Sequence, residues 1–155
     1  MTRQRGNALV EFAVMLPVLL LIMLGIMELG RYSYYSIAVA NAARAGAAYG
    51  AQSDRTAVDD AGMLAAVQAD ATNIASAITS PAPVTTQFCT EWNSSNQTES
   101  SPAPCPTSTV DTAIIHLRKY VSVTVTAKVN PLFHYFALPS SITVTSTAIS
   151  QVLQN

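Results

Sequence analysis

An apolar run near the N-terminus constrains the fold of this chain more than any other feature of its sequence. Sixteen consecutive residues, Phe12 to Met27, carry no charge, and the 22 residues from Ala8 to Leu29 contain only Glu11 and Glu28 as charged side chains. At 1.5 Å per residue, 22 helical residues measure about 33 Å, which matches the roughly 30 Å hydrocarbon core of a bilayer. The run therefore predicts a transmembrane helix over residues 7–30.

A cleaved secretory signal peptide is the alternative interpretation of this run. Such peptides have an apolar region of about 7–15 residues followed by a small-residue cleavage site. Here the run is longer, and Glu28-Leu29-Gly30-Arg31-Tyr32 follows it without such a site. Arg3 and Arg5 precede the run, so the positive-inside rule predicts a cytoplasmic N-terminus and an outside location for the chain after about Arg31.

Two residues of the predicted span are unusual for a membrane helix. Pro17 lacks a backbone donor and is expected to kink the helix, which membranes tolerate where neighbouring groups satisfy the freed carbonyl. Glu11 places a carboxylate in the span, at a cost of about 2.5–3.5 kcal/mol at the bilayer centre and less near the interface. Glu11 therefore either reaches the interface or has a charged partner.

The charge composition excludes two classes of protein. Charged residues make up 11% of the chain, where about 25% is usual, and the net charge is −1. A chain with this balance lacks the basic surface that nucleic-acid binding requires, and it is not a charge-rich disordered chain. Because the low charge continues after the span, we expect a membrane-tethered subunit that buries further surface against partners.

The residues before the apolar run form a more specific pattern. Arg5-Gly6-Asn7-Ala8-Leu9-Val10-Glu11-Phe12 combines a short basic leader, a glycine and a glutamate five residues later. This pattern resembles the processing site of type IV prepilins, which a membrane peptidase cuts after the glycine on the cytoplasmic side. The resemblance implies a leader of residues 1–6 and cleavage between Gly6 and Asn7. The new amine at Asn7 would lie one helical turn from Glu11, so the two could pair within a chain or between chains.

Further matches narrow the resemblance to one family. The leader motif is followed by Leu16-Pro17, Gly25-Ile26-Met27-Glu28-Leu29-Gly30-Arg31 and Ala42-Ala43-Arg44-Ala45-Gly46-Ala47. Over about residues 3–50 the chain resembles the TadE-like family, membrane-anchored pseudopilins and assembly proteins of the tight-adherence (Flp-type) pilus. The resemblance implies a bacterial inner-membrane location, or one in the pilus. The implied partners are pilin or pseudopilin subunits, inner-membrane assembly proteins, a prepilin peptidase, lipid, and copies of the chain itself in an oligomer or filament. Phe12 and Pro17 are expected to pack against neighbouring helices.

Residues 31–79 are predicted to be helical in two segments. A stalk helix continuing from the span has one face with spacings of 4, 4, 3 and 4: Tyr34, Ala38, Ala42, Ala45 and Tyr49. The small residues of this face allow close approach of either the protein's own sheet or another subunit. Thr56 and Asp59 resemble a capping box that starts a second amphipathic helix of about 22 residues. Its apolar stripe consists of Leu64, Val67, Ala71, Ile74 and Ile78.

Residues 80–112 are predicted to be a loop region closed by a disulfide. Thr90 to Thr109 is rich in Ser, Thr, Asn and Pro, which is typical of an exposed loop. Cys89 and Cys105 bracket most of it, and two cysteines outside the membrane favour a disulfide. The alternative is a metal site that also uses His116 and His134. The spacing Cys-x15-Cys-x10-His-x17-His matches no compact zinc pattern, so we expect no metal.

Residues 113–155 are predicted to form strands. In Tyr120–Val129 every second residue shares one face, Val121, Val123, Val125, Ala127 and Val129, as in a half-buried strand. A weaker repeat covers Ile142, Val144, Ser146, Ala148 and Val152, and Ala113–Leu117 is a candidate further strand. The connection Asn130–Pro139 contains the apolar residues Leu132, Phe133, Tyr135 and Phe136. This connection either packs into the hydrophobic core or forms a contact surface for a partner subunit or the membrane face.

The common catalytic motifs are missing from this sequence. It has no Gly-x-Ser-x-Gly, P-loop, His-Glu-x-x-His or Gly-rich dinucleotide turn, and both histidines have apolar neighbours. We expect neither an enzyme nor a cofactor. The expected fold is α+β and pilin-like: a transmembrane helix, a helical stalk, a second helix and a small antiparallel sheet. The expected function is that of a minor pseudopilin or pilin-like component of tight-adherence pilus assembly. The alternatives are an uncleaved single-pass scaffold of the pilus secretion machinery and an exported filament-forming or adhesive subunit.

Overall fold

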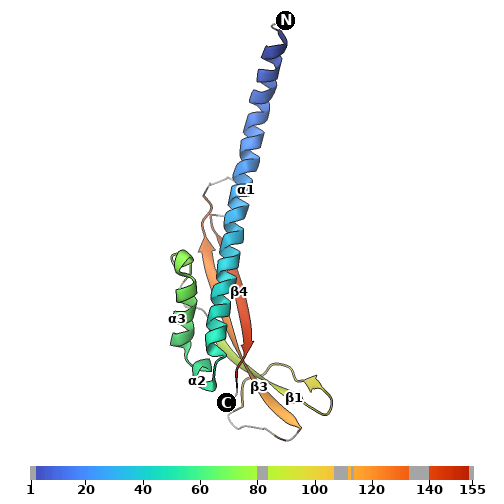
Figure 1. The fold of residues 1–155 in the computed structure, drawn as a ribbon, viewed down its shortest axis with the longest axis vertical. Coiled ribbons are helices and arrows are strands. Elements are labelled where there is room, and N and C mark those ends of the chain that lie inside the picture. The colour runs from blue at the N-terminus through green and yellow to red at the C-terminus, as the bar shows by residue number, and fades with distance from the viewer. Residues whose placement is uncertain (1–2, 80–83, 107–111, 113, 133–139, 154–155) are drawn as a thin grey trace.

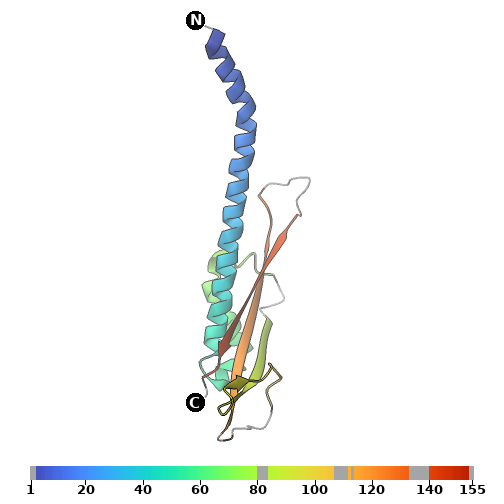
Figure 2. The ribbon, with the colours of Figure 1, turned by 90° about the vertical axis from the view of Figure 1, so that its right-hand side faces the viewer.

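The computed structural model describes residues 3–79, 84–106, 112, 114–132 and 140–153. Helices come first along the chain and strands afterwards, and the helices lie on one face of an antiparallel sheet (Figure 1). The first helix extends far beyond the rest of the molecule, so its N-terminal half stands alone at one end (Figure 1 and Figure 2). The predicted α+β class, with a long apolar N-terminal helix ahead of a small antiparallel sheet, is confirmed.

Helix α1 runs without interruption from Arg3 to Gly50, a length of about 72 Å at 1.5 Å per residue. Pro17 lies inside it, and the N-terminal part of the helix is curved (Figure 2). A proline inside a helix removes one backbone hydrogen bond, and bending is its usual consequence. The predicted span and stalk are therefore parts of one continuous element.

The C-terminal half of α1 supplies one side of the hydrophobic core. Four of its small or medium side chains are buried: Val39, Ala42, Ala43 and Ala47. Gly46 and Gly50 lie on the same side, and a Cβ at Gly46 would come within 2.7 Å of Val67 Cγ2. These glycines let neighbouring elements approach α1 closely, although each lowers helix propensity by about 1 kcal/mol relative to alanine.

The predicted second helix is divided into shorter helices, so the prediction was wrong about both its length and its N-terminal cap. Helix α2 covers Asp54–Ala57, α3 covers Asp60–Asp70, and the 3-10 helix η1 follows at Thr72–Ile74. Ser53 and Thr56 form the capping box of α2, whereas Asp59 is the N-cap of α3. Because an N-cap residue leaves the helical conformation, one helix of about 22 residues cannot continue across Asp59. Of the predicted apolar stripe, Val67, Ala71 and Ile74 are buried and Ile78 packs against the core. Leu64 is only half-buried, and Met63, which the stripe did not include, is fully buried beside them.

The described part of the chain contains four strands: β1 at Val84–Asn93, β2 at Thr98–Glu99, β3 at Ile115–Val129 and β4 at Ile142–Gln151. Their order in the sheet is β2-β1-β3-β4, and every neighbouring pair is antiparallel. Successive side chains of a strand point to opposite faces. The predicted alternation of β3 is confirmed, since its buried residues are Val121, Val123, Val125, Ala127 and Val129.

Two strand assignments differ from those predicted. Strand β1 lies within residues 80–112, the expected loop region, and pairs with β3 from Val84↔Thr124 to Asn93↔Ile115. The segment 113–117 adds no separate strand among the described residues, because Ile115 is already the first residue of β3. Polar residues interrupt the apolar positions of β1, so its strand conformation depends on pairing with β3 rather than on an alternating pattern.

A disulfide joins Cys89 to Cys105, as predicted, with Cα atoms 4.8 Å apart. Within the loop that it closes, Cys89 and Ala103 exchange two backbone hydrogen bonds of 2.8 and 3.0 Å. The Ser100 amide donates to the Glu91 carbonyl at 3.0 Å. The loop therefore covers the outer edge of β1 near Cys89, where an open strand edge could otherwise pair with another chain.

Candidate membrane anchor and contact surfaces

The N-terminal half of α1 exposes apolar side chains all round the helix. Fifteen of them between residues 9 and 29 are at least 40% exposed: Leu9, Val10, Phe12, Val14, Met15, Leu16, Val18, Leu19, Leu20, Leu21, Ile22, Met23, Ile26, Met27 and Leu29. Soluble monomers rarely expose apolar patches of this extent to water. In the part of the chain that the structure describes, α1 is also the one helix long and apolar enough to cross a membrane. These observations indicate membrane anchoring through α1.

The residues of the predicted processing site lie at the start of α1. Gly6 and Asn7 fall in its first turns, and Glu11 follows one turn after Asn7. The Glu11 side chain is exposed, and no hydrogen bond or ion pair joins it to another side chain that the structure describes. Phe12, which is 59% exposed, and Pro17 also lie on open surface. This part of the helix is therefore accessible to lipid or to a neighbouring helix.

Four residues from two distant segments meet where the exposed apolar surface ends, and we term them the boundary cluster: Glu28, Arg31, Asn130 and Leu132. Glu28 is only 9% exposed, and its carboxylate oxygens accept from the Leu132 amide at 3.3 and 3.4 Å. Arg31 Nη2 donates to the Asn130 carbonyl at 3.1 Å, and Arg31 Nη1 lies 3.6 Å from Glu28 Oε1. The cluster thus attaches the chain leaving β3 to the end of the apolar part of α1.

The charges of the boundary cluster compensate each other. A carboxylate removed from water needs hydrogen bonds and an opposite charge, and Glu28 has the Leu132 amide and the Arg31 guanidinium. The guanidinium also lies 5.8 Å from the centre of the Tyr35 ring, a cation–π distance. Sequence patterns did not predict this cluster, because its hydrogen-bond partners are 99 and 104 residues apart. The available signal was a Glu and an Arg three residues apart at the end of an apolar run.

The predicted face of the stalk is divided between the core and open surface. Ala42 is fully buried, Ala38 and Tyr49 pack against the core from its rim, Ala45 is half-buried and Tyr34 is 51% exposed. The buried stalk residues that the predicted face did not include are Val39, Ala43, Gly46, Ala47 and Gly50, and Glu28 is buried nearer the span. One side of the stalk therefore packs on the protein's own sheet, and the side with Tyr34 stays open.

An open hollow of about 480 Å³ lies between the exposed side of α1 and the start of β4. Its lining residues are Tyr32, Ser33, Ser36, Ile37, Ile142, Thr143 and Val144. Ile37 is 63% exposed, so the hollow has an apolar rim. It begins one residue after Arg31, next to the boundary cluster.

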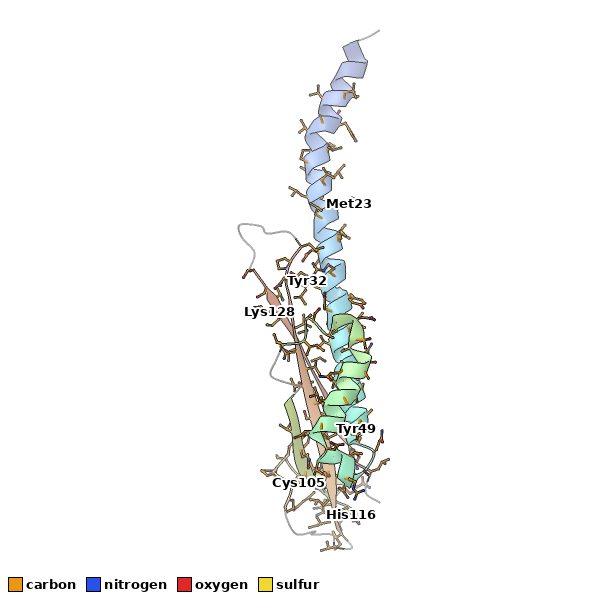
Figure 3. The ribbon with its side chains drawn as sticks, turned by 90° about the vertical axis from the view of Figure 1, so that its left-hand side faces the viewer. Met23, Tyr32, Tyr49, Cys105, His116 and Lys128 are labelled. Carbon is orange, nitrogen blue, oxygen red and sulfur yellow. A yellow bond between two sulfur atoms is a disulfide. The ribbon has the colours of Figure 1, made fainter. Side chains whose placement is uncertain are left out.

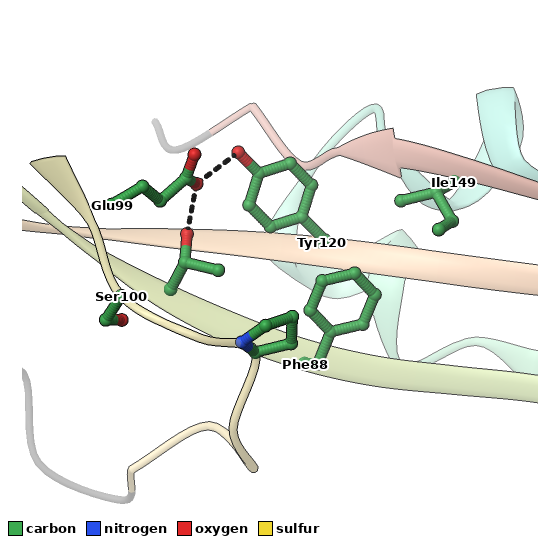
Figure 4. Close-up of a pocket in the computed structure, with 7 residues that line it drawn as sticks. Phe88, Glu99, Ser100, Tyr120 and Ile149 are labelled. Atoms are coloured by element: carbon green, nitrogen blue, oxygen red, sulfur yellow. Dashed lines mark hydrogen bonds between the residues drawn. The ribbon is translucent and has the colours of Figure 1, made fainter.

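A second hollow, of about 320 Å³, lies on the sheet face away from the helices (Figure 4). The rings of Phe88 and Tyr120 stack there with their centres 5.3 Å apart. The Glu99 carboxylate accepts from Thr90 Oγ1 at 2.5 Å and from Tyr120 Oη at 3.0 Å. These bonds, with that from Thr90 the stronger influence, lower the pKa of Glu99. The charged carboxylate thereby ties the short strand β2 to both β1 and β3.

The remaining predicted site residues are distributed as follows. Leu132 is 51% exposed, whereas Phe133, Tyr135, Phe136 and His134 lie outside the described residues. Cys89 and Cys105 are joined in the disulfide and His116 lies in β3. Within the described ranges, no group of three His, Cys, Asp or Glu side chains is placed to hold a metal ion.

The helical N-terminal part of the chain matches a known protein family. Residues 6–48 match the family model of the TadE-like proteins. No curated protein and no solved structure matches the chain. The matched segment includes Gly6 and Glu11, the exposed apolar half of α1, and Glu28 and Arg31 of the boundary cluster. The resemblance found in the sequence is therefore confirmed for this segment.

Proposed function

We propose that this chain is a minor pseudopilin or pilin-like component of tight-adherence pilus assembly. The premise is its match to the TadE-like family over residues 6–48. The TadE-like family implies a role in that pilus system and protein partners in pilus assembly, and it is not a family of enzymes. The finer role proposed here is helix packing. The subunit contributes the N-terminal half of α1 to a bundle of pilin helices, and its α+β part makes protein contacts outside the bilayer.

The division of α1 into two halves carries this proposal. Its N-terminal half exposes apolar side chains all round, while its C-terminal half is buried against α3 and the sheet. A helix satisfies its own backbone hydrogen bonds, so it can exchange lipid for neighbouring apolar helices without leaving polar groups unpaired. The α+β part keeps its packing during that exchange, because its core uses only the other half of the helix.

Glu11 supplies a specific contact for this packing. A carboxylate in the hydrocarbon region needs a partner, and cleavage between Gly6 and Asn7 would create an amine one turn away. The amine could belong to the same chain or to a neighbouring subunit. In the proposed arrangement a prepilin peptidase cuts the leader on the cytoplasmic side of the bacterial inner membrane. The α+β part then lies on the periplasmic or extracellular side.

Mass spectrometry of the N-terminus of membrane-extracted protein tests this proposal. The processed chain is expected to begin at Asn7, and Gly6→Leu is expected to retain the leader and to reduce pilus assembly. Gln4→Leu changes the leader but leaves Gly6 in place, so this matched control should be processed normally. A wild-type chain that still begins at Met1 would contradict the proposal that this protein is a cleaved pseudopilin.

The boundary cluster favours a second candidate, an uncleaved single-pass scaffold of the pilus secretion machinery. Its hydrogen bonds attach the end of β3 to α1 beside the span, which suits a domain that stays at the membrane and binds other assembly proteins. This candidate predicts an intact leader and unchanged pilus assembly in the Gly6→Leu variant. An exported filament-forming or adhesive subunit would instead be recovered as the main component of purified filaments.

A further inference from the structure

The exposed apolar residues of α1 define where its membrane span ends. Those that surround the helix on all sides extend from Leu9 to Leu29, which is 21 positions or about 31 Å of helix, close to the thickness of the hydrocarbon core; after Arg31 the exposed large apolar side chains of α1 are Tyr34 and Ile37. Glu28 and Arg31 mark the C-terminal limit of this segment. Charged side chains one turn from a span end reach the headgroup region, so the boundary cluster lies at the level of the lipid headgroups.

The end of the β3–β4 pair lies at this same level. Asn130 and Leu132, which follow β3 directly, contact Arg31 and Glu28 at 3.1 and 3.3 Å. The ends of β3 and β4 nearest this cluster point along α1 towards its span (Figure 1 and Figure 2). Lys128 in β3 lies close in height to Tyr32 of α1 (Figure 3). One end of the sheet therefore lies at the same height along α1 as the end of the exposed apolar run.

The residues at this end have the chemistry of a membrane interface. Leu132 is an apolar side chain that is 51% exposed. Lys128 is exposed, and a lysine at this level can place its ammonium group among anionic headgroups.

We propose that this end of the sheet, represented by Lys128 and Leu132, rests on the lipid bilayer at headgroup level. Lipid is the occupant that the geometry favours, because the boundary cluster holds Leu132 directly beside the point where α1 leaves the hydrocarbon core. The chain then has two membrane contacts, the span and the sheet end, and its α+β part has a fixed tilt on the membrane. This inference rests on the membrane anchoring in the proposed function but not on the pilus role.

Fluorescence quenching by brominated lipid tests the contact. Trp92 is the only tryptophan, and it pairs with His116 at the end of the sheet away from Lys128 (Figure 3). The double variant Trp92→Phe/Leu132→Trp moves this fluorophore to the proposed contact. The full-length protein is placed singly in lipid nanodiscs containing phosphatidylglycerol, with or without bromine near the glycerol backbone. The variant is expected to lose at least about half of its emission in brominated discs, because its indole lies in the interface.

Two controls make the result specific. The wild-type protein is the first control and should lose little emission, because Trp92 lies at the far end of the sheet. The variant Trp92→Phe/Ile149→Trp is the second and should also lose little emission, because Ile149 is 59% exposed but lies on the outer sheet face. Weak quenching at position 132, or equal quenching at all three positions, would overturn the proposal. A second preparation holds two copies per disc; emission at position 132 that does not respond to bromine but changes with the copy number would also overturn the proposal, since a second subunit would then cover this position. No outcome depends on leader cleavage or pilus assembly, so this test can fail independently of the proposed function.

Discussion

Asp59 connects the start of α3 to the end of α1. Its Oδ1 accepts from the Gly62 amide at 3.0 Å, and its Oδ2 accepts from the Tyr49 hydroxyl at 2.8 Å. The bond from Gly62, followed by that from Tyr49, lowers the pKa of Asp59 below its ordinary value of 3.8. The bond to Asp59 is also the main reason why the pKa of Tyr49 is raised. The folded state therefore favours the charged carboxylate.

Asp59→Asn is expected to remove an acid-sensitive part of the stability. Because the folded pKa lies below the unfolded one, the charged Asp59 stabilises the fold above the unfolded pKa, and this contribution disappears as the pH falls through the folded pKa. Urea unfolding should show wild type more stable than the variant at about pH 7, with a smaller difference at about pH 3. Tyr49→Phe, which removes one of the two bonds, should give a weaker effect of the same sign. An equal difference at both pH values would contradict this assignment.

Gly46→Ala is expected to lower stability, although alanine favours a helix over glycine by about 1 kcal/mol. The new Cβ would lie 2.7 Å from Val67 Cγ2 and 3.1 Å from Val123 Cγ1. Both neighbours are β-branched and stiff, and overpacking of this kind typically costs about 1–3 kcal/mol. The measurement is the urea midpoint of the detergent-solubilised chain. Gly30→Ala is the control, because no atom lies within 4 Å of the Cβ that it adds. If both variants unfold at the wild-type urea midpoint, the packing argument is wrong.

Among the secondary-structure elements, burial on one face decided which ones the sequence could predict. Strand β3 was predictable because Val121, Val123 and Val125 face the core and Thr124 and Thr126 face outward. Strand β1 was missed, because its polar residues give no alternation and its conformation comes from pairing with β3, up to 40 residues away along the chain. The length of α3 was overestimated, since periodicity continues through Ile74 while the Asp59 cap divides the helical segment.

The candidate surfaces were predictable to a smaller extent than the fold. The apolar span and the Gly6–Glu11 spacing are local patterns, so the sequence contains them directly. The boundary cluster joins Arg31 to Asn130 across 99 residues, and only the folded sheet brings these two residues together. The same holds for the hollow at Glu99, whose partners Thr90 and Tyr120 come from two other strands.

The disulfide is expected to stabilise both the fold and one edge of the sheet. In the loop-entropy model, a link across 16 positions contributes about 3 kcal/mol, so Cys89→Ala/Cys105→Ala should unfold at a lower urea concentration. Because the linked loop covers the edge of β1 near Cys89, proteolysis within residues 94–103 should also become faster. Reduced wild-type protein is the matched comparison and should behave like the variant. An unchanged midpoint and cleavage rate would show that the loop holds its place without the bond.

For the whole molecule, membrane retention is expected to depend on the middle of the α1 span. Leu20 is 51% exposed there, and an arginine at a helix centre is unfavourable by about 2.5–3.5 kcal/mol on insertion scales. Leu20→Arg should therefore increase the fraction of chain released by alkaline carbonate extraction. Ile149→Arg introduces the same charge at a 59% exposed position of β4 and should leave extraction unchanged. Full retention of Leu20→Arg would argue against a span centred at this residue.

The continuity of α1 also has a mechanical consequence. The helix is unbroken from Arg3 to Gly50, and its last turns are embedded in the core of the α+β part. A force applied to that part is therefore transmitted along a single rod, with no loop to stretch first. Drawing the apolar segment fully out of a bilayer would lift the sheet by the length of that segment, about 31 Å. Traction on the outer part thus reaches the first helical turn without passing through a loop, along a helix whose one missing backbone hydrogen bond is at Pro17.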